Sequence, residues 1–127
     1  MRSKVDDSVA VISAKQKMVG NRLLSDIRKL RAATIPEGVS EIGEQWFRGS
    51  AVESVAVPAS VTEIKKEAFI NCSSLRHVTF GAGCKLRTIG EQSFSGSGLI
   101  GLAIPSSVTT ICKDAFRGCD SLERVTF

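Results

Sequence analysis

The side chains in this chain that could carry out chemistry are four cysteines and one histidine: Cys72, Cys84, Cys112, Cys119 and His77. A thiol beside an imidazole makes a hydrolase pair, and paired cysteines bind zinc or form a disulfide. The chain has no Cys-x-x-Cys pair, no phosphate-binding loop, no nucleophile elbow and no paired catalytic carboxylates. We therefore expect no enzyme activity, no metal site and no cofactor.

Cys72 and Cys119 belong to a repeated stretch. The sequences KKEAFINCSSLRHVTF (65–80) and CKDAFRGCDSLERVTF (112–127) are identical at nine positions. Four copies of the unit align over residues 34–127, and a fifth begins at the last residue. The apolar residues that open the copies are Ile35, Val57, Phe80, Ile104 and Phe127, with spacings of 22, 23, 24 and 23 residues. This period is typical of leucine-rich-repeat solenoids, in which each copy forms one coil.

Two apolar patterns recur within each copy. The first ends in period-two alternation, as in Val55 and Val57, and predicts one short parallel strand per coil that a proline or glycine ends. In the second pattern an isoleucine stands five residues before a phenylalanine. We interpret this spacing as a turn or two of helix. The phenylalanines are Phe47, Phe69, Phe94 and Phe116. We expect their rings to stack as the spine of the core, with Phe69 and Phe94 fully buried.

The register of the copies also predicts the state of the thiols. Cys72 and Cys119 lie two coils apart, which separates them by about 10 Å at a strand spacing of about 4.8 Å. A disulfide tolerates at most about 7 Å between Cα atoms, so we expect free buried thiols. Cys84 and Cys112 are expected nearer the surface. His77 should lie on an exposed strand face, away from Cys72 in the core.

The copies closely resemble the BspA-type leucine-rich repeat, which is written around I-P-x-x-V-T-x-I-x-x-x-A-F-x-x-C-x-x-L. The matching stretches are VPASVTEIKKEAFINCSSL and IPSSVTTICKDAFRGCDSL, and the resemblance covers residues 34–127. It implies a right-handed, strand-rich α/β solenoid with parallel strands. It also implies a protein of bacterial or protist surfaces, associated with adhesion and protein binding and lacking a catalytic motif.

Two departures from the pattern predict local features. The third copy reads GAGCKL where the second reads PASV, so a loop should project at residues 81–86. Trp46 fills a position that is Ala68, Ser93 or Ala115 in the other copies. A ring of this size predicts a place at the N-terminal end of the stack, against a covering segment.

Residues 1–33 are the predicted cover. Apolar residues at helical spacing, including Val5, Val9 and Ile12, predict an N-terminal cap of two short helices, or of one helix broken at Gly20–Asn21. This segment holds eight Lys and Arg against three Asp, whereas residues 34–127 hold nine basic and ten acidic residues. A basic arm can attract nucleic acid or anionic membrane. The absence of interleaved aromatic or glycine residues favours a solvated helix face instead.

Solenoids of this kind usually bind partners through their strand face. The predicted face is small, mixed and without a deep pocket, which suits a protein better than a small-molecule substrate. The candidate residues are Ser54, Arg76, His77, Thr79, Ile100, Arg124 and Thr126. The sequence thus predicts a non-enzymatic protein-interaction module, resembling adhesion proteins.

The alternative is a structural unit that associates with itself. A coil that stops at residue 127 would expose an apolar strand edge at Leu122, Val125 and Phe127. A second copy of the chain would close this edge as a two-fold dimer, and further repeats of a longer protein would also cover it. The compartment stays open as well. The resemblance suggests the cell surface and no secretory signal is seen, while free thiols favour a reducing compartment.

Overall fold

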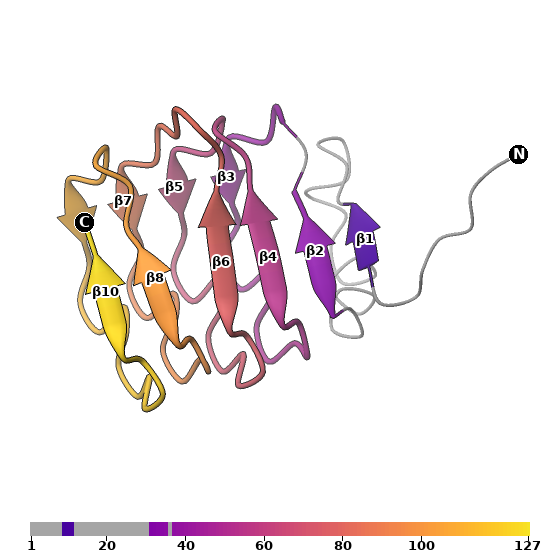
Figure 1. The fold of residues 1–127 in the computed structure, drawn as a ribbon, viewed down its shortest axis with the longest axis vertical. Helices are drawn as coiled ribbons and strands as arrows, with labels where there is room; N and C mark the ends of the chain where they lie inside the picture. Colours follow the sequence, from indigo (N-terminus) through magenta and orange to yellow (C-terminus); the bar gives the residue numbers. More distant parts are fainter. Residues whose placement is uncertain (1–8, 12–30, 36) are drawn as a thin grey trace, which may run out of the picture.

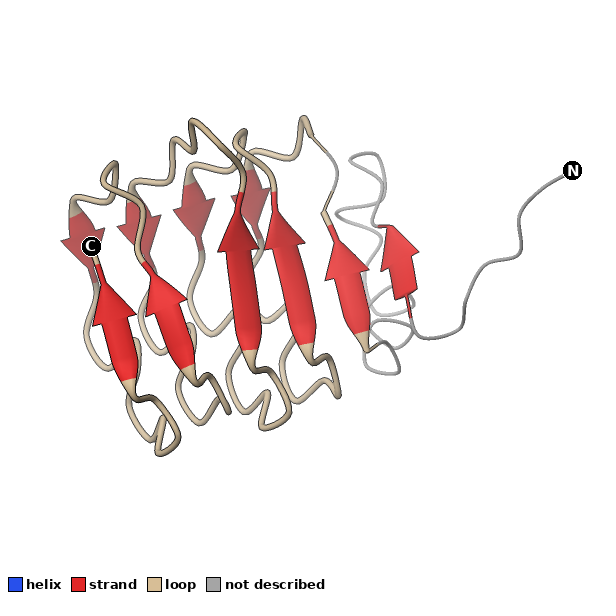
Figure 2. Ribbon diagram, viewed as in Figure 1, coloured by secondary structure: helices blue, strands red, loops and turns tan. Residues whose placement is uncertain are grey.

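The computed structural model describes residues 9–11, 31–35 and 37–127, and there the chain winds as a solenoid of stacked coils (Figure 1). Its regular elements in this part are short β-strands arranged in two layers (Figure 2). The front layer holds β1 (Val9–Val11), β2 (Ala32–Thr34), β4 (Ser54–Val57), β6 (His77–Phe80), β8 (Gly101–Ala103) and β10 (Arg124–Thr126). The back layer holds β3 (Glu41–Ile42), β5 (Glu63–Ile64), β7 (Thr88–Ile89) and β9 (Thr110–Ile111).

Successive coils are joined by parallel strand pairing. In the front layer β1, β2, β4 and β6 form one sheet, in which Val55 lies opposite Ala33 and Val78. β8 pairs with β10 in a second sheet, and β3, β5, β7 and β9 form the back sheet. Equal positions of successive copies therefore lie side by side. The predicted parallel front strand of each coil is confirmed, whereas the two-residue back strands were not predicted.

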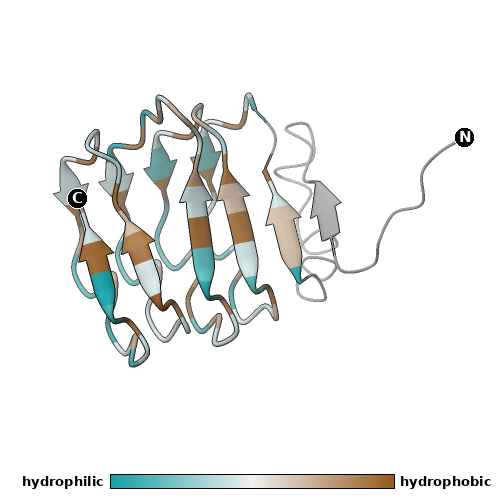
Figure 3. Ribbon diagram, in the orientation of Figure 1, coloured by the Kyte–Doolittle hydropathy of each residue, from teal (hydrophilic) through white to brown (hydrophobic). Residues whose placement is uncertain are grey.

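The core lies between the two layers and repeats with the coils. On β4, Val55 and Val57 are buried while Ser54 and Ala56 are half-buried, as period-two alternation requires. The same pattern gives the front strands their apolar bands in Figure 3. The four phenylalanine rings stack face to face, as predicted. Their centroids are 4.8, 5.1 and 5.6 Å apart along the series, and Phe69 and Phe94 are fully buried.

The segment before each phenylalanine is a chain of turns, so the predicted turn or two of helix is wrong. In residues 43–50, three overlapping turns are closed by bonds from Trp46 N–H to Gly43 O, Arg48 N–H to Gln45 O and Ser50 N–H to Phe47 O. Gln45 and Gly49 have left-handed backbones, with φ of 61° and 64°, which an α-helix cannot contain.

These turns leave every second N–H free to bond the next coil. Gln45, Phe47 and Gly49 donate to the carbonyls of Lys66, Ala68 and Ile70 at 3.3, 2.8 and 2.9 Å. The next two coil-to-coil junctions repeat the arrangement. Backbone bonds that a helix would close within one coil therefore join neighbouring coils.

The predicted helical N-terminal cap is wrong where the structure tests it. Val9–Val11 form strand β1, which pairs in parallel with β2 in register Val9 to Ala32. The sequence Val-Ala-Val has the β-branched residues that favour a strand, and it continues the front ladder. Residues 1–8 and 12–30, which hold the rest of the predicted cap, lie outside the described residues.

Trp46 is buried at 6% exposure within the core. Gly43 makes this possible, because a Cβ at that position would collide with the indole ring. In the next copy Lys65 replaces the glycine and Ala68 replaces the tryptophan. The copy without the glycine therefore has a small side chain in place of the indole ring.

Candidate functional site: the front strand face

The exposed face of the front layer consists of small and polar side chains in rows. Ladder register places Thr34 beside Ala56 and Ala56 beside Thr79, and it places Ala103 beside Thr126. The next row contains Ser54 beside His77, and Gly101 beside Arg124. Most of these side chains are short and project little from the sheet, so a broad partner surface can approach the strands.

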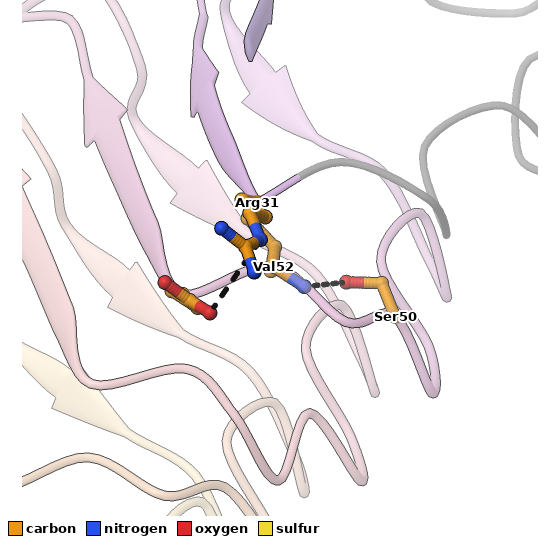
Figure 4. Close-up of polar contacts among 4 residues, drawn as sticks. Arg31, Ser50 and Val52 are labelled. Atoms are coloured by element: carbon orange, nitrogen blue, oxygen red, sulfur yellow. Dashed lines mark hydrogen bonds and ion pairs between the residues drawn. The ribbon is translucent and has the colours of Figure 1, made fainter. Parts of the chain in front are cut away.

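A row of four charged residues and one isoleucine directly precedes the front strands. It consists of Arg31, Glu53, Arg76, Ile100 and Glu123, whose backbones are joined from coil to coil by hydrogen bonds of 2.6 to 3.4 Å. Arg31 Nε lies 3.9 Å from Glu53 Oε2, and Val52 N–H donates to Ser50 Oγ at 3.1 Å nearby (Figure 4). Both members of this ion pair are more than half exposed, so it stabilises the fold little. Ile100 is 38% exposed and gives the row one apolar contact point.

The structure brings the seven predicted contact residues to this one face. Ser54, His77, Thr79, Arg124 and Thr126 lie on β4, β6 and β10, while Arg76 and Ile100 directly precede β6 and β8. Ser54 is half-buried and the other six are exposed. Their role in binding stays a prediction.

Grooves along the carboxyl ends of the front strands were not predicted from the sequence. One of about 580 Å³ crosses β6, β8 and β10, and one of about 340 Å³ crosses β2, β4 and β6. The available signals were Gly81, where the three other copies have Pro36, Pro58 and Pro105, and the two extra residues of the third copy.

The predicted self-association edge is apolar and exposed in the last coil. Phe127 is 86% exposed and Val125 36%, while Leu122 is half-buried. Ile111 of β9, which the sequence analysis did not single out, is 42% exposed and lines a hollow of about 540 Å³ with Phe127. Asp114, Phe116 and Gly118 are the equivalent turn donors of this coil. Within the described chain their N–H groups have no backbone acceptor.

The reactive side chains do not form a catalytic pair. Cys72 is fully buried, and its Sγ donates to Phe47 O at 2.8 Å. Burial raises the pKa of the Cys72 thiol to about 11, so the thiol stays protonated at neutral pH. His77 is exposed on the front face.

All four cysteines carry free thiols, and Cys72 and Cys119 occupy the position that the first and third copies fill with Ser50 and Ser97. Cys119 Sγ donates to Phe94 O at 3.0 Å and lies 3.3 Å from Ser97 Oγ. Ser50 lies beside Cys72 in the same way, at 3.9 Å. The thiols are therefore part of the core packing. The described residues hold no cluster of three or more potential metal ligands.

The back layer carries a compact charged group instead. Lys65 Nζ lies 3.2 Å from Glu41 Oε1, and the hydrogen bond and charge of Glu41 raise the pKa of Lys65. Glu63 and Glu44 add to this effect.

No helix in the described part of the chain has the length and apolarity needed to span a bilayer.

Parallel strands in coils of 22 to 24 residues, with an inner phenylalanine stack, define a leucine-rich-repeat solenoid. The chain belongs to the BspA-type leucine-rich-repeat family, whose model matches residues 8–126 in six copies. The match begins close to β1, within residues 1–33, the predicted cap.

Solved structures of bacterial proteins share this fold. A leucine-rich repeat protein from Bacteroides capillosus is 31% identical with a TM-score of 0.66, over 79% of this chain and 83% of its own. The pneumococcal vaccine antigen PcpA is 26% identical with a TM-score of 0.66, over 76% of this chain and 30% of its own. A leucine-rich cell surface protein from Faecalibacterium prausnitzii is 28% identical with a TM-score of 0.51, over 76% and 35%. The chain thus spans about a third of the last two. A comparison with curated proteins found no match.

Proposed function

We propose that the chain is a non-enzymatic protein-binding module whose contact surface is the front strand face. The observation that carries this proposal is the gathering of six exposed residues, from Arg76 to Thr126, on one low face that the backbone ladders hold in place. Membership of the BspA-type family supports a protein partner, because leucine-rich repeats usually serve protein–protein contacts.

Site-specific photo-crosslinking in cells that produce the chain tests the proposal. A photoreactive side chain at His77 on β6 should trap a partner protein, and Arg124→Glu should reduce the yield of the adduct at least fivefold. The matched control places the same group at Arg87, which is exposed just before β7 of the back layer. No adduct from His77, or equal adducts from both positions, would refute a front-face contact.

A cell-surface location is the second part of the proposal. The solved neighbours include a protein described as a cell surface protein and one described as a vaccine antigen. Proteolysis of intact cells should release peptides of this chain if it is displayed outside. Peptides that appear only after cell lysis would contradict a surface location.

Self-association through the last coil is the alternative function. The exposed side chains of Ile111, Val125 and Phe127 favour it. The turn layer limits its geometry, because Asp114, Phe116 and Gly118 present N–H donors only. In a two-fold dimer the same N–H groups of both copies would face each other, and they cannot accept hydrogen bonds. Such a dimer would therefore have to form through the edge of β10 and the exposed apolar side chains.

A further inference from the structure

Gly101 occupies a position of the front face where the fold does not require a glycine. It is the first residue of β8, and the equivalent residues of β6 and β10 are His77 and Arg124. Its φ lies outside the left-handed region, and a Cβ there would lie 3.4 Å from Arg124 O, an ordinary van der Waals contact. Gly98 differs, because a Cβ at that position would lie 2.3 Å from Ser73 O. A glycine that a strand does not need often marks a place where another molecule approaches closely.

The glycine leaves a gap between two larger side chains. Ladder register places Gly101 beside Arg124, and the bond from Ile100 N–H to Arg76 O places it beside His77. At a strand spacing of about 4.8 Å, the backbones of His77 and Arg124 lie about 10 Å apart, with no side chain between them. In Figure 3 the first parts of β6 and β10 are hydrophilic and that of β8 is neutral. Both flanking side chains are exposed, so the gap is open to a partner and lies between two groups that can donate hydrogen bonds.

The charges beside the gap favour a carboxylate. The row that contains His77, Gly101 and Arg124 holds no acidic residue, and neither Arg76 nor Arg124 forms an ion pair with the described residues. A guanidinium donates two parallel hydrogen bonds to a carboxylate, and an imidazole N–H can donate to the same group. Two bonds of about 2.8 Å with a carboxylate between them fit a gap of about 10 Å.

The wider face favours a single acidic side chain over a polyanion. Glu53 and Glu123 lie in the row that directly precedes the front strands, so the exposed charges of this layer are mixed. A nucleic acid or an anionic membrane would bring many negative charges against these two carboxylates, which disfavours both. Ile100 is 38% exposed and directly precedes Gly101, so it adds an apolar contact beside the gap. This combination suits a polypeptide in which an acidic residue stands next to an apolar one.

We propose that the gap over Gly101 binds the carboxylate of an aspartate or glutamate of a partner protein. His77 and Arg124 hold the carboxylate from its two sides, and an apolar side chain next to the acidic residue packs against Ile100. This inference rests on the proposed front-face function and adds the place and the chemistry of the contact. Exposed charge pairs contribute selectivity more than affinity, so the preference for a carboxylate over an amide is the property to measure.

Phage-displayed random peptides are the probe. Peptides selected on the wild-type chain should carry an acidic residue next to an apolar one, and replacing that acid by its amide should weaken binding at least tenfold. Arg124→Gln should weaken binding of the acidic peptide to the same degree, and it should leave binding of the amide peptide nearly unchanged, as a direct contact requires. Arg87→Gln is the matched control, because it makes the same change at an exposed residue just before β7 of the back layer. It should bind within twofold of the wild type.

Two substitutions at Gly101 test the gap itself. Gly101→Ala has room for its Cβ and should bind the acidic peptide within threefold of the wild type. Gly101→Leu should fill the gap and weaken binding at least tenfold. Thr34→Leu is the matched control, since it adds apolar bulk to an exposed residue of β2 on the same layer. Urea unfolding verifies that each variant retains the fold.

Several results would overturn the inference: no enrichment of peptides, equal binding of the acid and amide forms, or full binding to Gly101→Leu. A single-stranded oligonucleotide or a phosphatidylserine vesicle that binds more tightly than the peptides, and is lost on Arg124→Gln, would also overturn it. The two proposals can fail separately. A partner trapped through His77 that binds Gly101→Leu as tightly as wild type would remove the carboxylate site and leave the front-face function. Acid-dependent peptide binding without any adduct from His77 in cells would leave the carboxylate site and remove the front-face function.

Discussion

Ser93 occupies a core position that the neighbouring coils fill with Ala68 and Ala115. Its hydroxyl oxygen is buried and has no hydrogen-bond partner. An unsatisfied buried polar group costs about 1–3 kcal/mol, so Ser93→Ala should raise the free energy of unfolding by about 1 kcal/mol. Urea denaturation measures this. Ser50→Ala is the control and should lower stability, because Ser50 accepts a bond from Val52 N–H. A Ser93→Ala variant less stable than wild type would show that the hydroxyl has a partner.

Cys72 should make stability depend on pH above its usual pKa of 9.0. Burial raises the folded-state pKa to about 11, so the folded chain holds the proton more tightly than the unfolded chain. The contribution of the protonated thiol to the free energy of unfolding is fully present below pH 9. It falls as pH rises from about 9 to 11, by roughly 2–3 kcal/mol at most. Cys72→Ser is the matched variant, since Ser50 and Ser97 fill this position in other coils. If both proteins lose the same stability over this range, Cys72 is not the cause.

The phenylalanine stack is the element that joins the coils through the core. Phe94 is fully buried between two rings, whereas Phe116 is half-buried and has one ring neighbour. Phe94→Ala should cost about 3–5 kcal/mol through lost burial and a cavity, and Phe116→Ala should cost clearly less. Urea unfolding of the two variants compares them. A loss below about 1 kcal/mol for Phe94→Ala would be inconsistent with a stack that stabilises the core.

The same elements show how far sequence reasoning reaches. The front strands were predictable because Val55 and Val57 alternate and a proline follows. The turns were not, because a five-residue spacing also fits a helix, and the deciding bonds, such as Phe47 N–H to Ala68 O, cross between coils. Strand β1 is only three residues long, so its apolar residues also fit the spacing of a helical stripe. The larger groove was missed because Gly81 and the two extra residues of the third copy indicate a changed loop but not the space that the loop leaves between coils.

The part of the chain that the structure describes presents two surfaces that a second protein could cover, the front face and the last coil. If the last coil self-associates, Phe127→Asp or Val125→Lys should convert a dimer into a monomer while the preceding coils stay folded. Sedimentation at about 100 µM detects the change, a concentration well above a typical micromolar dissociation constant. A wild-type chain that is monomeric at this concentration would exclude the dimer.

The proposed function of the whole molecule depends on partner binding through the front face. Hydrogen–deuterium exchange, with and without the partner trapped through His77, tests it most directly, because bound strands exchange more slowly. We expect slower exchange in β4, β6 and β8 and unchanged exchange in β5 and β7. Protection confined to β5 and β7, with β4, β6 and β8 unchanged, would contradict the assignment of the front face as the binding surface.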